Sequence, residues 1–196
     1  HIYSPFTDPK YLDWWGGYYP PYDWPHIVGI DPGWGHPTGV VWCALDPDTQ
    51  ERYYYMEHKA GKLLPEDHAE IILSLNQSMG IVAPIYVIDS QARATDQKGG
   101  SVWQDYRDSG IVARLATKKL HEGNIQLARL MRVTEGPYAK ETQFHVSSEC
   151  PMFIEEIGEY QHRQKSDVAQ AELYVDKKND IISAARYTNW ELSTID

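Results

Sequence analysis

HIVGIDPG, residues 26–33, is an apolar run that ends at once in Asp-Pro-Gly. This pattern is typical of a buried strand that enters a turn. Two further strands are predicted beyond it, GVVWCALDP at 39–47 and the tyrosine-rich ERYYYMEHK at 51–59. The DPDT segment between them suits a hairpin loop. We therefore expect three consecutive antiparallel strands.

The segments that follow predict a crossover to a parallel strand. LPEDHAEIILSLNQSMG (64–80) has Pro65 in the first turn of an expected helix and Gly80 at its end. APIYVIDS (83–90) is a fourth strand, and a helical crossover places it parallel to the first strand. The remaining elements expected are a strand at 111–116 and helices at 100–109, 121–133, 149–160 and about 177–192. This order predicts an α/β fold, with a mixed sheet of three antiparallel and then parallel strands flanked by helices.

The N-terminal region has a different composition from the rest of the chain. WWGGYYPPYDWP lies within residues 1–26, which we interpret as an aromatic-rich arm or the remnant of an interdomain linker. Residues 27–196 form the expected domain, and 196 residues suit a single domain. We expect no membrane association and no secretion, because there is no apolar run of spanning length and no signal peptide. Cys43 and Cys150 are expected to be buried thiols in a reducing compartment.

The charge is unevenly distributed along the chain. The net charge is −10, yet residues 91–140 hold nine Lys or Arg against five Asp or Glu. This basic middle is consistent with a face that binds phosphates, and equally with an ordinary solvated surface.

Two aspartates end neighbouring strands of the predicted sheet. Asp31 follows IVGI and Asp89 follows IYVI. Adjacent strands lie about 4.8 Å apart, so the two carboxylates would converge. Two such charges repel, and a divalent cation would remove the conflict because hard cations prefer carboxylate oxygens.

A third acid, Asp180, lies at the start of the last expected helix, which has a strongly apolar face. Asp176 lies four residues earlier on the same face. Together with Asp31 and Asp89, Asp180 predicts a two-metal site with ions about 3.5–4 Å apart. Each acid also has a plain structural interpretation: Asp31 as a turn former, Asp89 as a cap and Asp180 as a first-turn acid.

These segments resemble a known family, the ribonuclease H-like nuclease domain of the large terminases of tailed bacteriophages. The resemblance runs from about His26 to Trp190 and rests on GIDPG…HPTGVV, YVIDS and KKNDIISAARY. KKLHEGNIQLARLM resembles the family's basic stretch and helix, and FHVSSECPMFIEEIGEY its strand and helix before the last acid. The first motif alone also occurs in Holliday-junction resolvases.

The resemblance implies a ribonuclease H-like fold, Mg²⁺ or Mn²⁺ as metal, and cutting of concatemeric double-stranded DNA with little sequence preference. By position, Asp31, Asp89 and Asp180 match the family's three metal-binding acids. The chain departs from the family at Asn179 and Ser183, where members often or usually carry an acid. Asp176 is the residue that would compensate.

A whole terminase also carries an ATPase domain. No GxxxxGK[ST] motif occurs here, so the chain would be the nuclease half of a longer protein. The implied partners are double-stranded DNA, that ATPase domain, the portal and the small terminase subunit. The implied location is the host cytoplasm during viral assembly.

The predicted mechanism is two-metal phosphodiester hydrolysis, which leaves 5′ phosphates and 3′ hydroxyls. His36 and His145 are candidate assisting groups, although a structural role fits their positions better. The candidates for contacts with the DNA backbone are Lys118, Lys119, Arg93 and Lys98.

Three other functions fit parts of the pattern. The first is a junction resolvase or transposase-like nuclease of the same fold, although resolvases usually carry Glu where Asp89 stands. The second is an actin-like or sugar-kinase phosphotransferase, suggested by Asp31-Pro32-Gly33 with Thr38-Gly39, for which the chain is too short. The third is a non-catalytic module that docks through the aromatic arm.

Overall fold

The computed structural model describes residues 1–4, 19–33, 35–95, 99–116, 120–135, 140–166 and 180–192. Its strands are β1 (Ile2–Tyr3), β2 (His26–Asp31), β3 (Thr38–Leu45), β4 (Arg52–Ala60), β5 (Ile85–Ile88), β6 (Arg114–Leu115), β7 (Thr134–Glu135), β8 (Lys140–Glu141) and β9 (Phe144–Ser147). Its helices are α2 (Pro65–Met79), the 3₁₀ helix η1 (Ser90–Arg93), α3 (Val102–Asp108), α4 (Leu120–Leu130), α5 (Pro151–Ser166) and α6 (Asp180–Leu192).

The expected mixed sheet is confirmed. In the described part of the chain, seven strands form one sheet in the order β1-β9-β4-β3-β2-β5-β6. The β2–β3 and β3–β4 pairs are antiparallel, while β5 pairs parallel with β2 and β6 parallel with β5. The helix between β4 and β5 therefore makes the crossover that the sequence predicts.

Two strands extend the sheet beyond what the local sequence indicates. β9 pairs parallel with β4, and β1 pairs parallel with β9. Residues 2–3 thus belong to the sheet, whereas the interpretation of 1–26 as an aromatic-rich arm or linker remnant stays a prediction. The other expectation for the arm, a domain that begins at residue 27, stays a prediction, and residues 5–18 lie outside the described residues.

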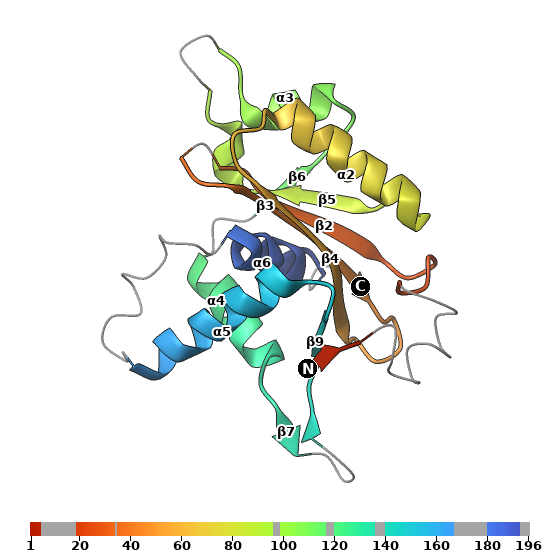
Figure 1. Ribbon diagram of the computed structural model, residues 1–196, viewed down its shortest axis with the longest axis vertical. Coiled ribbons are helices and arrows are strands. Elements are labelled where there is room, and N and C mark those ends of the chain that lie inside the picture. The colour runs from red at the N-terminus through yellow and green to blue at the C-terminus, as the bar shows by residue number, and fades with distance from the viewer. Residues whose placement is uncertain are drawn as a thin grey trace.

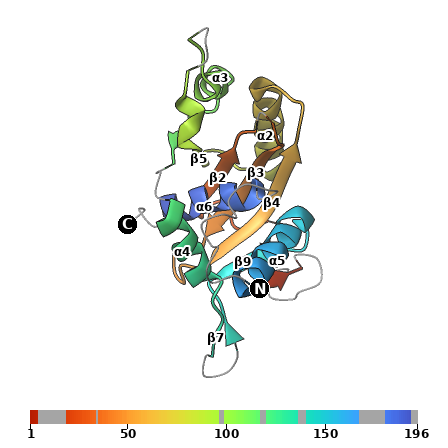
Figure 2. The same ribbon diagram turned by 90° about the vertical axis from the view of Figure 1, so that its left-hand side faces the viewer.

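Helices cover both faces of the sheet, as Figure 1 shows: α2 and α3 on one side, and α4, α5 and α6 on the other. Alternate residues of β2 divide between these two cores. Ile27 packs with Phe153 of α5 and Ile181 of α6, whereas Val28 and Ile30 pack on the α2 side. The β7–β8 hairpin projects from the body of the fold in both views (Figures 1 and 2). None of the described helices is long and apolar enough to cross a membrane.

Candidate metal centre

Three residues on three strands form a row across the sheet. Asp31 of β2 is paired in register with Gly39 of β3, and Gly39 is paired with Lys59 of β4. Side chains alternate between the faces of a strand, so Asp31 points away from the α2 side, to which Ile30 belongs. The row therefore faces α6.

Glycine brings the start of α6 onto this row. A Cβ atom at Gly39 would lie 2.5 Å from the carbonyl carbon of Asp180, and a Cβ atom at Gly29 would collide with the carbonyl oxygen of Ala184. Only residues without a side chain permit such a close approach of helix to sheet. Asp180, the first residue of α6, is thereby placed over Gly39, between Asp31 and Lys59.

Asp89 reaches the same place from β5. Its backbone N–H donates to the Ile30 carbonyl oxygen at 3.1 Å, next to Asp31. Its Oδ1 accepts from the Gln91 N–H at 2.9 Å and caps η1, so the plain structural interpretation holds for one carboxylate oxygen. The other oxygen, Oδ2, accepts a hydrogen bond of 2.9 Å from the hydroxyl of Tyr187 on α6.

Tyr187 joins the two strand-end acids. Its hydroxyl lies 2.9 Å from Asp89 Oδ2 and 3.3 Å from Asp31 Oδ1. Burial raises the pKa of this phenol, and the charges of Asp31 and Asp89 raise it further. Tyr187 therefore stays a neutral donor between the two acids.

The electrostatics of Asp31 reveal crowding of negative charge. The side chain is 9% exposed. Burial, followed by the charges of Asp89 and Asp180, raises the pKa of Asp31 to about 7, while Arg186 and His36 oppose the rise. A carboxylate in this state gains from any cation that enters between the acids.

Asp180 has two basic neighbours. Its Oδ1 lies 2.8 Å from His36 Nδ1, and its Oδ2 lies 3.0 Å from Lys59 Nζ. Of the two candidate histidines, His36 thus contacts the site. His145 does not, because it pairs with Tyr53 near the far end of β4 and stacks on its ring.

The donor set suits a hard divalent cation, since three carboxylates from three elements lie close enough to interact, with Asp31 and Asp180 buried and Asp89 half-buried. As the described side chains lie, no group of three or more His, Cys, Asp or Glu is already arranged around an ion position. An ion would have to take over contacts that Tyr187, His36 and Lys59 now make with the acids. The chemistry of the residues fits a metal, and the assignment of Asp31, Asp89 and Asp180 as its ligands stays a prediction.

Of the other residues that the sequence singles out for metal or DNA binding, the structure describes only Arg93 and Ser183. Arg93 is exposed at the end of η1, four residues beyond Asp89 on the same edge of the sheet. The Ser183 hydroxyl accepts a hydrogen bond of 2.8 Å from the Arg186 guanidinium. Asp176, Asn179, Lys98, Lys118 and Lys119 lie outside the described residues.

Sequence reasoning missed four residues around the acids: Tyr187, Lys59, Glu156 and Arg186. A signal existed for Tyr187, which is seven residues after Asp180 and so lies two helical turns along the same face. A signal also existed for Lys59, because it lies on β4, which pairs with β3, and β3 in turn pairs with β2. No local pattern indicated Glu156 or Arg186, because their contacts depend on how α5, α4 and α6 pack.

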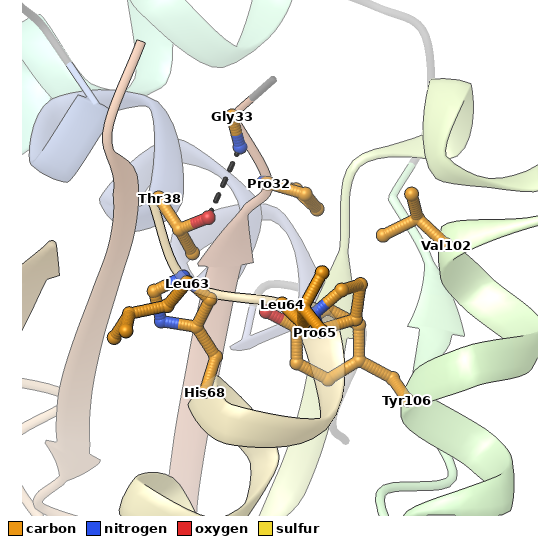
Figure 3. Close-up of a pocket in the computed structure, with 9 residues that line it drawn as sticks. All are labelled: Pro32, Gly33, Thr38, Leu63, Leu64, Pro65, His68, Val102 and Tyr106. Atoms are coloured by element: carbon orange, nitrogen blue, oxygen red, sulfur yellow. Dashed lines mark hydrogen bonds between the residues drawn. The ribbon is translucent and has the colours of Figure 1, made fainter. Parts of the chain in front are cut away.

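A pocket lies at the same end of the sheet, on the α2 side. Figure 3 shows the turn after β2, with the Gly33 N–H donating to Thr38 Oγ1 at 3.1 Å. The pocket is lined by Pro32, Gly33, Thr38, Leu63, Leu64, Pro65, His68, Val102 and Tyr106. Its walls are mainly apolar and carry no carboxylate, so it offers nothing to a hard cation.

Comparison with solved structures identifies the fold. The chain resembles the P22 large terminase nuclease domain with a TM-score of 0.65 and 19% identity, over 95% of this chain and 84% of that one. It resembles the large terminase nuclease domain of bacteriophage SPP1, solved with bound Mn, with a TM-score of 0.59 and 15% identity, over 97% and 95% of the two chains. It also matches the large terminase of a thermophilic bacteriophage with a TM-score of 0.65 and 15% identity, over 96% of this chain and 41% of that one.

No protein-family model matches the chain, and no characterised protein matches its sequence. The likeness is therefore one of structure. It confirms the resemblance to large terminase nuclease domains at the level of the fold, and with it the ribonuclease H-like sheet expected from the sequence.

Proposed function

We propose that this chain is a divalent-metal-dependent endonuclease that cuts concatemeric double-stranded DNA during the packaging of a bacteriophage genome. The observation that carries the proposal is the convergence of Asp31, Asp89 and Asp180 from two strand ends and one helix start. Burial, and then repulsion from Asp89 and Asp180, raises the pKa of Asp31, and a bound cation would relieve that repulsion. The terminase nuclease fold supports the same reaction.

In this proposal Asp31, Asp89 and Asp180 hold Mg²⁺ or Mn²⁺. Two such ions would supply activation of the attacking water and stabilisation of the leaving 3′ oxygen. In the metal-free protein the Tyr187 hydroxyl bridges the carboxylates of Asp31 and Asp89, and a bound ion would take over these contacts. The SPP1 domain that this fold resembles was solved with Mn, which supports metal binding by a site of this kind.

The DNA is proposed to lie along the edge where β2 and β5 end. Arg93 is exposed there and reaches a phosphate without sequence preference, as contacts to the backbone require. Lys98, Lys118 and Lys119 are proposed to extend this surface. The neighbouring Arg107 is less available because its guanidinium lies 5.5 Å from the centre of the Trp103 ring.

The proposed partners are those of a large terminase. This chain spans 41% of the large terminase from the thermophilic bacteriophage, a protein also solved in complex with ATP-γ-S. We propose an ATPase domain in the same full-length chain, and contact with the portal and the small terminase subunit in the host cytoplasm.

Cleavage of supercoiled plasmid in Mn²⁺ tests the function. We expect nicked and linear products from the wild type, and losses of about 10³-fold for Asp31→Asn, Asp89→Asn and Asp180→Asn, because each removes metal-based stabilisation worth several kcal/mol. Asp48→Asn is the matched control, since Asp48 is an exposed acid in the β3–β4 turn. Undiminished cutting by the three variants would refute the assignment. Faster cutting of four-way junctions than of linear duplex would favour the resolvase alternative.

A further inference from the structure

Glu156 of α5 is a buried acid outside the predicted metal set, and both of its oxygens are engaged. It is 7% exposed. Oε1 lies 2.6 Å from Lys59 Nζ. Oε2 accepts from the backbone N–H groups of Ile181 and Ile182 at 3.0 Å each. These are among the first N–H groups of α6, which have no partner within the helix.

The first consequence is positional. A carboxylate at a helix N-terminus satisfies unpaired donors and complements the helix dipole. Glu156 thus ties the start of α6 to α5 immediately after Asp180. α5 is fixed in the same way, because Glu57 of β4 accepts from the N–H groups of Met152 and Phe153 at 2.9 and 2.8 Å. Two carboxylate caps in series therefore set where the Asp180 backbone lies over Gly39.

The second consequence concerns Lys59. Its ammonium group lies 2.6 Å from Glu156 Oε1 and 3.0 Å from Asp180 Oδ2, so two acids share one cation. If Lys59 were held by Asp180 alone, its ammonium group would occupy the Asp180 oxygen that a metal needs and would neutralise the charge of that carboxylate. Glu156 supplies the competing partner for Lys59.

We propose that Glu156 is a positioning residue of the metal centre, which anchors the start of α6 and holds Lys59 so that the Asp180 carboxylate stays available to a divalent cation. The inference rests on the proposed function, in which Asp180 binds metal. Partners that orient a metal ligand from behind are known to govern affinity without touching the ion.

Mn²⁺ binding to the full chain, measured by titration calorimetry, tests the proposal without DNA or turnover. Glu156→Gln keeps the size of the side chain and removes its charge. We expect Mn²⁺ binding about tenfold weaker than in the wild type. Glu155→Gln is the matched control, because Glu155 is the exposed neighbour on the same helix and loses the same charge. Equal affinity in the two variants would overturn the proposal.

Lys59→Met separates this role from a merely structural one. With no ammonium beside Asp180, the single variant should bind Mn²⁺ more tightly than the wild type. In the double variant Glu156→Gln/Lys59→Met, most of the lost affinity should return. A double variant as weak as Glu156→Gln would overturn the proposal, which requires that Glu156 hold Lys59 in addition to capping α6. Should Glu156→Gln fail to fold, Lys59→Met decides, since weaker binding in that variant also contradicts the proposal.

Failure of the inference is distinguishable from failure of the proposed function. If the wild type does not bind Mn²⁺, or binds it at a site that Asp31→Asn and Asp180→Asn leave intact, both the proposed function and the role of Glu156 are refuted. If that binding is present and Glu156→Gln leaves it unchanged, only the role of Glu156 falls. Amide hydrogen exchange without metal adds an independent readout, in which Ile181 and Ile182 should exchange faster in Glu156→Gln than in Glu155→Gln.

Discussion

The two faces of the sheet differ in chemistry at the end where β2 stops. On the α6 face, Asp31, Asp89 and Asp180 converge with Lys59 and Tyr187. On the α2 face, the same strands end beside a mainly apolar pocket that His68 helps to line. The imidazole of His68 shares a hydrogen bond of 3.0 Å with that of His58. One face gathers charge, and the other holds neutral groups.

Strand alternation explains how neighbouring residues serve such different surroundings. On β4, Lys59 contacts Asp180 and Glu156, whereas His58, one residue earlier, contacts His68 of α2. Glycine explains the rest: Gly29 and Gly39 admit the backbone of α6 to the sheet. The difference shows that a close helix, and not the strands alone, brings a third acid to the strand ends.

The two faces should also respond to pH in opposite directions. Burial and neighbouring acids raise the pKa of Asp31, so its contribution to stability is lost as the pH rises to about 7. Burial lowers the pKa values of His58 and His68, so their contribution is present above 6.5 and is lost as the pH falls through their folded-state pKa values.

The largest effect is expected where the helix meets the sheet. Gly39→Ala places a methyl group against the Asp180 backbone, and we expect a loss of about 3 kcal/mol in the free energy of unfolding, as for other overpacked sites. Chemical denaturation measures it. Gly35→Ala is the control, since no heavy atom lies within 4 Å of the added Cβ. Equal stability of the two variants would contradict the close approach of α6.

Asp31→Asn should stabilise the metal-free protein while removing metal binding. Burial and the neighbouring acids raise the folded-state pKa of Asp31 to about 7, so above that pH the folded protein carries a charged Asp31 at a cost in stability. We expect a gain of about 2 kcal/mol at pH 8, shrinking towards zero as the pH falls to 4. Denaturation in the presence of a chelator at several pH values tests this. A variant less stable than the wild type at pH 8 would show that the acids do not repel.

Tyr187→Phe removes the hydroxyl that joins Asp31 and Asp89. In the metal-free protein we expect a loss of about 1 kcal/mol, because Asp89 Oδ2 loses its donor. Saturating Mn²⁺ should narrow the difference, since an ion between the acids replaces the hydroxyl. Thermal melts with and without Mn²⁺ make the comparison, and a gap that Mn²⁺ leaves unchanged would separate Tyr187 from the metal centre.

The smallest effect is expected on the α2 face. His68→Asn should flatten the loss of stability on acidification from pH 7 to 5, because protonation of the His58–His68 pair is opposed in the folded state. We expect the free energy of unfolding to differ by less than about 1 kcal/mol. The comparison is made in the Asp31→Asn variant, so that titration of Asp31 does not mask the effect. If stability falls equally between pH 7 and 5 with and without His68, the pair does not contribute to the pH dependence.

Much of the fold was predictable, because its central elements carry strong local patterns. The apolar run ending at Asp31, the hairpin turn at 46–49 and the capped helix at 64–80 each indicate one structure. β1 and β9 were harder to place. Ile2–Tyr3 and Phe144–Ser147 are short, and their parallel pairing joins segments that are far apart in the sequence.

The site was predictable only in part. Period-two alternation and strand order bring Asp31 and Asp89 together, and the apolar face of the last helix brings Asp180 to them. The contacts of Glu156 and Arg186 were not predictable, because they depend on how α4, α5 and α6 pack together. Gly39 carried a usable signal, being a small residue in register with a candidate ligand.

A crystal of the domain soaked in Mn²⁺ tests the central claim most directly. We expect anomalous density between the carboxylates of Asp31, Asp89 and Asp180, with the Tyr187 hydroxyl displaced from its bridging position. Well-diffracting crystals without density there, and with Tyr187 still bonded to Asp89, would contradict it.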